Sequence, residues 1–200
     1  FNQAYAAAPV CSPYRAAFMT GQYPARVGIT DYMRWVSDPL STDHITIAEM
    51  FKRAGYKTGL VGKWHLTGYK DKGAKDEVFP EEHGFDEAIM WEKVKSDHGF
   101  KHWFNDQNEY LTDRLGKEAV NFIERWKDQP FFLYFSHYAV HTWLGAKGHL
   151  TDKYKFKKRT GRYKSGPYRN TLKVFKDQYV TPHLAANLES LDDTVGMVME

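Results

Sequence analysis

The most informative part of the chain reads Cys11-Ser12-Pro13-Tyr14-Arg15-Ala16-Ala17-Phe18-Met19-Thr20-Gly21 and holds the only cysteine. Pro13 suits the first turn of a helix, because its missing N–H is not needed there. Such a helix places Cys11 at its N-terminus and Arg15 about one turn further along the same side. Unpaired N–H groups, the positive end of the helix dipole and a guanidinium then lie together, which favours binding of an anion.

This pattern, Cys11-x-Pro13-x-Arg15 followed by the run to Gly21, resembles the signature of the type I, formylglycine-dependent sulfatases, and the chain looks arylsulfatase-like. Pro9 and the residues Tyr23-Pro24-Ala25-Arg26 add to the resemblance. In that family the cysteine is oxidised after synthesis to an aldehyde, formylglycine, whose hydrate is the nucleophile. The alternative interpretation is a buried structural cysteine beside a helix start.

Length and composition fit one domain: 200 residues, 42% apolar and 16% aromatic, are enough for a sizeable core. No run approaches the roughly 18 apolar residues that cross a membrane. The chain starts with Phe1-Asn2-Gln3-Ala4, without an initiating Met or a signal-peptide pattern. We therefore expect an internal piece of a longer protein, with residues 1–200 forming part of a catalytic domain.

Positive charge gathers between Lys147 and Lys176, where eleven basic residues stand against one acid, Asp152. We interpret residues 147–176 as a basic, aromatic loop or insertion in the domain. It is either a solvated loop or an electropositive surface that steers a polyanion. Its tyrosines and phenylalanines suit stacking on sugars or bases, so nucleic acid is an unlikely but open alternative.

The pattern of residues predicts helices and strands in alternation. Thr46 and Glu49 have the form of a capping box that opens a helix ending before Gly55, and residues 56–62 form a short apolar strand. Residues 67–110 show no clean periodicity, and we expect irregular structure with short elements there.

A further helix is predicted from Thr112 to Trp126, a buried strand over 131–135, and a last helix from Thr181 onward. The apolar positions of the two helices are Leu115, Ala119, Phe122, Ile123 and Trp126, and Leu184, Leu188, Leu191, Val195 and Val198.

This order of elements indicates an α/β layered fold with a mainly parallel sheet. The resemblance implies an alkaline-phosphatase-like fold, with a central, mostly parallel or mixed sheet flanked by helices and incomplete at both ends. Ligands collect beyond the carboxyl ends of such strands. Lys63 and His65 follow one predicted strand, and His137 and His141 follow the other, so we expect all four at one crevice.

Residues 62–66, Gly-Lys-Trp-His-Leu, resemble the second signature of the family. The resemblance implies that Lys63 contacts sulfate and the aldehyde hydrate, and that His65 hydrogen-bonds the hydrate and acts as the base that releases sulfate. By the same resemblance His141 protonates the leaving oxygen, and Arg15 stabilises the hydrate and binds the sulfate. Lys63, His141 and Arg15 are thus the expected substrate-binding residues. A strand-end lysine and a partly buried histidine are the alternatives.

The assignment of His141 over His137 stays open, because Trp143 stands where the family usually has proline. Two histidines four residues apart also suit a metal-binding helical face. A strand leading into a loop argues against that reading. Asp192 and Asp193 are expected on the solvated side of the last helix.

The resemblance further implies one divalent cation, usually calcium, held by the converted Cys11 and by acidic and amide side chains that lie outside residues 1–200. We expect this piece alone to bind metal weakly and to be inactive, because hard cations need several fixed oxygens. A formylglycine-generating or other sulfatase-maturing enzyme is the implied partner. The implied location is secreted, periplasmic or lysosomal.

The predicted function is hydrolysis of sulfate monoesters, from a sulfated glycan or an aryl sulfate. Cations and N–H donors surround the anion, and one hydroxyl of the Cys11-derived hydrate attacks sulfur while the other later expels sulfate. Two alternatives remain: a phosphonate or phosphodiester hydrolase of the same superfamily, and a non-catalytic module that binds sulfated glycans.

Overall fold

The computed structural model describes residues 3, 5–141, 144–155 and 180–200. The chain forms two compact units, one made of Phe1–Trp91 and Asn121–Ser136, the other of Glu92–Val120 and His137–Glu200. None of the helices in the described residues is long and apolar enough to cross a membrane.

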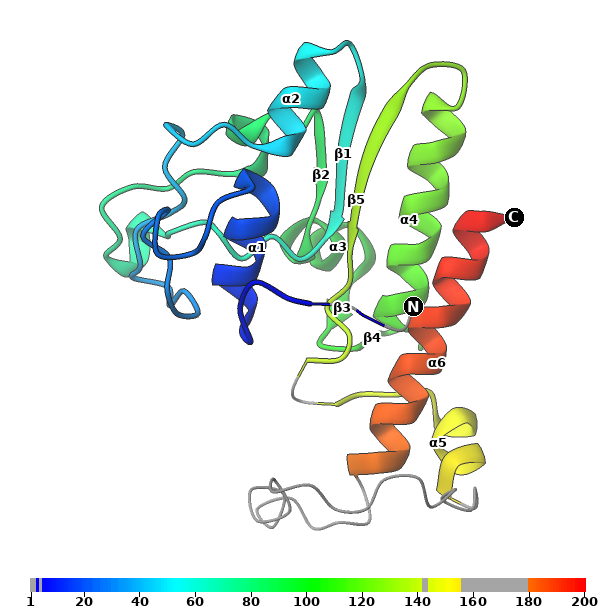
Figure 1. Cartoon of the computed structure of the whole chain (residues 1–200). Helices are drawn as coiled ribbons and strands as arrows, with labels where there is room; N and C mark the ends of the chain where they lie inside the picture. Colours follow the sequence, from blue (N-terminus) through cyan, green and yellow to red (C-terminus); the bar gives the residue numbers. More distant parts are fainter. Residues whose placement is uncertain (1–2, 4, 142–143, 156–179) are drawn as a thin grey trace. The chain divides into compact units, whose positions relative to one another are not determined.

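The first unit is built on a parallel sheet (Figure 1). Its strands are β1 (Lys57–Gly62), β2 (Glu87–Ile89) and β5 (Phe131–Ser136), in the order β2-β1-β5. The register of β1 on β5 runs from Lys57 opposite Phe131 to Gly62 opposite Ser136. The positions of the two predicted strands are therefore confirmed, and their carboxyl ends lie at the same edge of the sheet. The expected burial of residues 131–135 is wrong: β5 is only partly buried, because it is the last strand on its side of the described sheet.

Two helices accompany this sheet, α1 (Cys11–Thr20) and α2 (Ile47–Arg53). The predicted capping box is present: Glu49 N–H donates to Thr46 Oγ1 at 3.2 Å, and Thr46 N–H donates to Glu49 Oε2 at 2.9 Å. These bonds satisfy N–H groups that the first helical turn leaves open, so α2 begins at Ile47.

Alternation along the strands divides the sheet into two faces. Leu60 of β1 and Phe132 and Tyr134 of β5 belong to the face that carries the main apolar core, together with Ala16 and Met19 of α1. Gly59 points the other way, toward the ring of Phe122 in α4 (Leu111–Trp126). This helix begins one residue before the predicted Thr112, which is buried inside the first turn.

The expectation of irregular structure with short elements over 67–110 is confirmed, although the sequence did not indicate what the elements are. Short 3-10 helices do occur, η1 (Lys70–Lys72) and η2 (Pro80–His83), but β2 is a full member of the parallel sheet and α3 (Trp91–His98) is a helix. A three-residue strand is too short to show a period of its own. Its pairing with β1 decides its structure.

The second unit contains α3 residues from Glu92, the hairpin β3 (Phe100–Lys101) and β4 (Phe104–Asn105), the first part of α4, and two helices, α5 (Gly148–Lys155) and α6 (Val180–Met199). The predicted apolar stripe of α6 is wrong in part. Leu188 is 51% exposed and Val195 40%, whereas the small residues of the helix are buried: Ala186, Asn187, Ser190 and Thr194.

Close packing explains which side of α6 is buried. The hydroxyl of Tyr110 donates to Asn187 Oδ1 at 2.8 Å, and Asn187 Nδ2 donates to the Gly145 carbonyl at 2.9 Å. A Cβ at Gly116 of α4 would lie 2.8 Å from the Thr194 methyl group. The polar contacts and the close approach to Gly116 require small side chains on the buried side of α6. This requirement, and not the apolar stripe, decides which side of the helix is buried.

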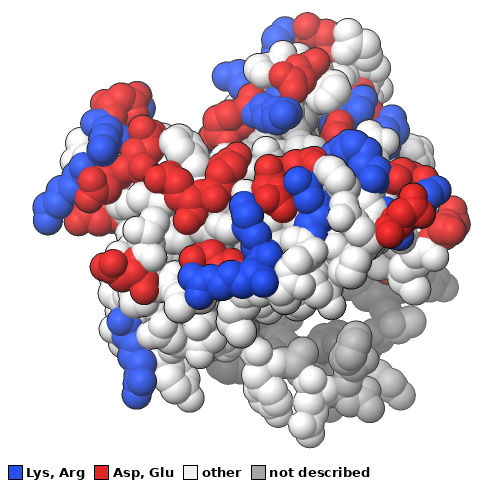
Figure 2. Space-filling model, turned by 90° about the horizontal axis from the view of Figure 1, so that it is seen from above, with Lys and Arg blue, Asp and Glu red and all other residues white. Residues whose placement is uncertain are grey.

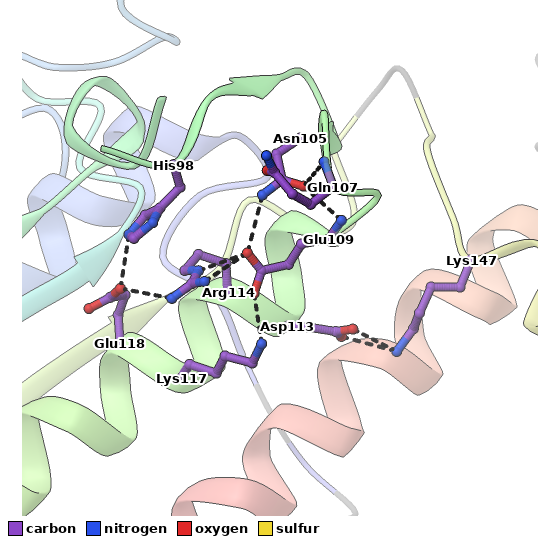
Figure 3. Close-up of polar contacts among 9 residues, drawn as sticks. All are labelled: His98, Asn105, Gln107, Glu109, Asp113, Arg114, Lys117, Glu118 and Lys147. Atoms are coloured by element: carbon purple, nitrogen blue, oxygen red, sulfur yellow. Dashed lines mark hydrogen bonds and ion pairs between the residues drawn. The ribbon is translucent and has the colours of Figure 1, made fainter. Parts of the chain in front are cut away.

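Ion pairs line the amino-terminal half of α4 (Figure 3). Glu109 accepts from Arg114 at 2.8 Å and from Lys117 at 2.7 Å, and Glu118 lies 3.3 Å from His98. Burial alone would raise the pKa of Glu109, but the hydrogen bonds from Lys117 and Arg114 lower it below the ordinary value. The charges of Arg114 and Lys117 are therefore balanced by Glu109 within the second unit.

The basic segment predicted over 147–176 falls mostly on residues 156–179, outside the described residues. In the described part, Lys147 pairs with Asp113 at 3.0 Å and Lys153 with Glu189 at 2.6 Å. On the face drawn in Figure 2, Lys and Arg are interspersed with Asp and Glu. The interpretation of this segment as a loop or insertion stays a prediction.

Candidate active site

Cys11 is the first residue of α1, and its side chain is partly exposed. Val10, the N-cap residue, is extended (φ −129°, ψ 161°) and offers no side-chain cap. Pro13 lies in the first turn, as predicted. The N-terminus of α1 therefore presents main-chain N–H groups without a side-chain cap beside Cys11, and such groups favour an anion.

Arg15 joins α1 to the carboxyl edge of the sheet. Its Nη1 donates to the Lys63 carbonyl at 2.7 Å, to the Tyr134 hydroxyl at 3.2 Å and to the Ser136 hydroxyl. Its Nε is buried and has no hydrogen-bond partner within the described residues. A buried, unpaired N–H on a charged group is costly, so this atom suits an anionic ligand.

Lys63 follows β1 directly and lies beside both Cys11 and Arg15. Its main-chain N–H donates to the Ser136 carbonyl at 2.6 Å, which continues the β1–β5 ladder. Burial is the main cause that lowers the pKa of the Lys63 amine, and the charge of Arg15 adds to it, while a hydrogen bond and charge interaction with Cys11 oppose it. Two cationic groups and the thiol thus converge at one place.

His65 lies two residues further along and adopts a left-handed backbone conformation with φ 61°. Its Nε2 is 3.0 Å from the carbonyl oxygen of Met33. Since a carbonyl oxygen only accepts, Nε2 carries the proton of this bond. His65 therefore belongs to the same unit as Cys11, Arg15 and Lys63, and its ring is held by Met33.

His137 and His141 follow β5 but belong to the second unit. The His137 ring is 3.2 Å from Thr194 Oγ1, and burial lowers its pKa to about 4, so it is uncharged at neutral pH. The His141 side chain is exposed, and its main-chain N–H donates to the Tyr138 carbonyl at 2.9 Å. Trp143 lies outside the described residues.

The described residues alone do not fit a calcium ion. They contain no group of three or more His, Cys, Asp or Glu side chains that could hold a metal. Calcium takes about 6–8 oxygen ligands. Cys11, once converted, would be one donor at most.

Three contributors were missed from the sequence: Tyr134, Ser136 and Met33. Ser136 is the last residue of β5, so the rule that ligands gather at carboxyl ends of parallel strands points to it. Tyr134 lies inside an apolar run, and nothing in its sequence context indicates a partner. Met33 acts through its main chain, which leaves no pattern in the sequence.

Comparison with known proteins places the chain in a family. The Sulfatase family model matches residues 1–200. The arylsulfatase of Hemicentrotus pulcherrimus is 32% identical over 189 residues, covering 82% of this chain and 34% of that protein. The N-acetylglucosamine-6-O-sulfatase of Bacteroides thetaiotaomicron is 28% identical over 159 residues, covering 75% of this chain and 26% of that protein.

The solved structures agree. The crystal structure of Ps i-CgsB in complex with k-i-k-neocarrahexaose matches with a TM-score of 0.68 and 27% identity, covering 98% of this chain and 45% of that chain. The chain thus spans less than half the length of these relatives. The likeness confirms the expected alkaline-phosphatase-like layered fold. The chain belongs to the type I sulfatase family.

Proposed function

We propose that the full-length protein containing this chain is a sulfuric ester hydrolase that cleaves sulfate monoesters. The observation that carries the proposal is the convergence of Arg15 and Lys63 on Cys11 at the uncapped start of α1. Two cations, main-chain N–H groups and an oxidisable side chain in one place suit an anionic ester. The family membership makes sulfate the first choice among such anions.

Each residue has a proposed role. A formylglycine formed from Cys11 would supply the nucleophilic hydroxyl of its hydrate. Lys63 and Arg15 bind the sulfate oxygens, and the buried Arg15 Nε is a donor with no partner among the residues that the structure describes. His65 accepts the proton whose loss releases sulfate, and the exposed His141 protonates the leaving oxygen.

The environment of His137 supports choosing His141 as the acid. A ring whose pKa is about 4 is uncharged at neutral pH, and the single N–H of a neutral imidazole is too weak an acid to protonate a leaving group. The His137 ring also contacts the Thr194 hydroxyl within the second unit. His141 is exposed and therefore accessible to a substrate.

The proposed substrate is a sulfated carbohydrate, with aryl sulfates as a simpler alternative. One relative is named for a sulfated N-acetylglucosamine and another is solved with an oligosaccharide, while a third is named an arylsulfatase. We propose calcium as the metal, held mainly by side chains outside these 200 residues, and a sulfatase-maturing enzyme as partner. A secreted, periplasmic or lysosomal location follows from the same resemblance.

The test uses the full-length protein, produced together with a formylglycine-generating enzyme and assayed with calcium. Mass spectrometry of the Cys11 peptide measures conversion to the aldehyde. Release of sulfate is measured from 4-nitrophenyl sulfate, N-acetylglucosamine 6-sulfate and carrageenan oligosaccharides. Cys11→Ala and Lys63→Ala should abolish turnover, whereas Lys72→Ala, at an exposed lysine, should not.

Other outcomes separate the alternatives. Faster turnover of an aryl phosphonate than of the aryl sulfate would favour a phosphonate or phosphodiester hydrolase. An ordinary thiol at Cys11 in a competent host, with binding of sulfated glycans but no turnover, would favour a binding module. Tighter, steeply salt-dependent binding of random oligonucleotides would favour nucleic acid. The 200-residue chain by itself should show no turnover.

A further inference from the structure

Three residues far apart in the sequence form a hydrogen-bonded chain inside the first unit. Ser12, next to Cys11 in α1, is fully buried, and its Oγ accepts the main-chain N–H of Met33 at 3.0 Å. The carbonyl of Met33 lies 3.0 Å from Nε2 of His65. The first turn of α1 is thereby connected to His65 through one residue.

Met33 is well suited to hold its position. Its side chain is only 6% exposed and packs in the main apolar core, while its neighbours Tyr32 and Arg34 are exposed. The core fixes the side chain, Ser12 fixes the N–H, and the carbonyl is left pointing at His65. A main chain anchored in this way cannot move without breaking a buried contact.

The bond to Met33 selects one tautomer of His65. Because the carbonyl only accepts, Nε2 carries the hydrogen, and in the neutral ring Nδ1 is then the nitrogen with the lone pair. The backbone of His65, with φ 61°, is in a region that non-glycine residues rarely adopt. Such a conformation persists only where the surroundings hold it.

We propose that Ser12 and the main chain of Met33 form a positioning relay that fixes the Nε2–H tautomer and the ring direction of His65 relative to residue 11. Nδ1 is then the atom of His65 that accepts a proton. Ser12 is a positioning residue in this relay, since it acts through Met33 and His65. The catalytic part of this inference rests on the proposed sulfatase function, whereas the tautomer does not.

The first test reads the tautomer directly. Long-range ¹H–¹⁵N spectra of the full-length protein with labelled histidine, with His65 assigned by loss of its signals in His65→Gln, should show a single Nε2–H form. Ser12→Ala should give a mixture of tautomers, and Ser12→Thr, which keeps the hydroxyl, should restore the single form. Thr20→Ala is the matched control, because it removes a hydroxyl bonded to the Ala16 carbonyl on the same helix.

The second test is kinetic, with turnover of 4-nitrophenyl sulfate divided by the aldehyde content at residue 11. Ser12→Ala should lower kcat roughly 10- to 100-fold with little change in KM, because a misdirected base affects the proton transfer. In a His65→Ala background, Ser12→Ala should cause no further loss. Additive losses would overturn the relay, as would an unchanged tautomer in folded Ser12→Ala.

The two proposals fail in different ways. A wild-type protein with the Nε2–H form of His65 but no sulfate release would contradict the sulfatase function and leave the relay intact. A wild-type protein that releases sulfate but has a mixed or Nδ1–H tautomer would contradict the relay alone. Reduced aldehyde content in Ser12→Ala would show a role in maturation, and the division by aldehyde content removes that effect from the comparison.

Discussion

Replacing Gly59 by alanine should destabilise the sheet on which the site is built. A Cβ at Gly59 would lie 2.4 Å from Cε2 and 2.6 Å from Cζ of Phe122, whereas ordinary contacts begin at 3.4 Å. The ring or the strand must therefore move by about 1 Å. Neither moves freely, because β1 is paired on both sides and Phe122 is 1% exposed and packs edge-on against Phe131 at 6.0 Å.

The expected magnitude follows from two opposing effects. Overpacking of a core by a methyl group costs about 1–3 kcal/mol. Alanine also restricts the unfolded chain, which favours the folded state by about 0.4–1 kcal/mol where its conformation is allowed. We expect a net loss of about 1–2 kcal/mol in the free energy of unfolding, or about 2–8 °C in Tm.

The assay is thermal and urea unfolding of the wild type and the variant, followed by near-UV circular dichroism. Gly196→Ala is the control, since this helical glycine has open space around its Cβ position and should gain about 0.5–1 kcal/mol. Phe122→Leu removes the ring edge and should reduce the cost of Gly59→Ala. A Gly59→Ala protein as stable as the wild type, or strictly additive effects of the two changes, would refute the packing argument.

Three further predictions concern ionisable groups. Because burial lowers the pKa of His137 from 6.5 to about 4, its contribution to stability is complete above pH 6.5 and is lost as the pH falls through 4. Urea unfolding should show a loss of at most about 3 kcal/mol over that range, and His137→Gln should remove this pH dependence. Glu109→Gln should cost about 1–2 kcal/mol at pH 7, since the carboxylate accepts from Arg114 and Lys117, and the cost should shrink once the pH falls below the lowered pKa of Glu109. A cost that stays the same at every pH down to the acid unfolding of the protein would speak against the ion pairs. Arg15→Lys should lower kcat/KM of the full-length enzyme about 100-fold, because lysine keeps the charge but lacks the planar guanidinium, in which Nη1 bonds to three acceptors while Nε is a further donor. A rate within a factor of three of wild type would exclude this role.

Much of the fold was predictable because its signals are local. The capping box of α2 needs only Thr46 and Glu49, and the strand β5 is a continuous apolar run. The short strand β2 was not predictable, since three residues carry no period and their structure depends on pairing with β1. The buried side of α6 was not predictable either, because it depends on α4. Gly116 has no side chain, which lets Thr194 of α6 approach the α4 main chain closely.

The same division holds for the site. Cys11, Arg15, Lys63 and His65 were predicted from the two motifs, and the first three do converge, but their roles and that of His141 remain predictions. By itself the sequence indicated the candidate site residues and that β1 and β5 end at one edge, because motifs, caps and apolar runs are formed by adjacent residues.

Only the tertiary structure decided how these groups are held. Arg15 bonds to residues 48, 119 and 121 positions away, and Ser12 reaches His65 through Met33, 21 positions from one and 32 from the other. Hydrogen bonds of this kind depend on where the packed sheet and its loops bring the two partners, which include side-chain hydroxyls for two of the Arg15 bonds and main-chain atoms for the others. No pattern of side chains along the sequence encodes them.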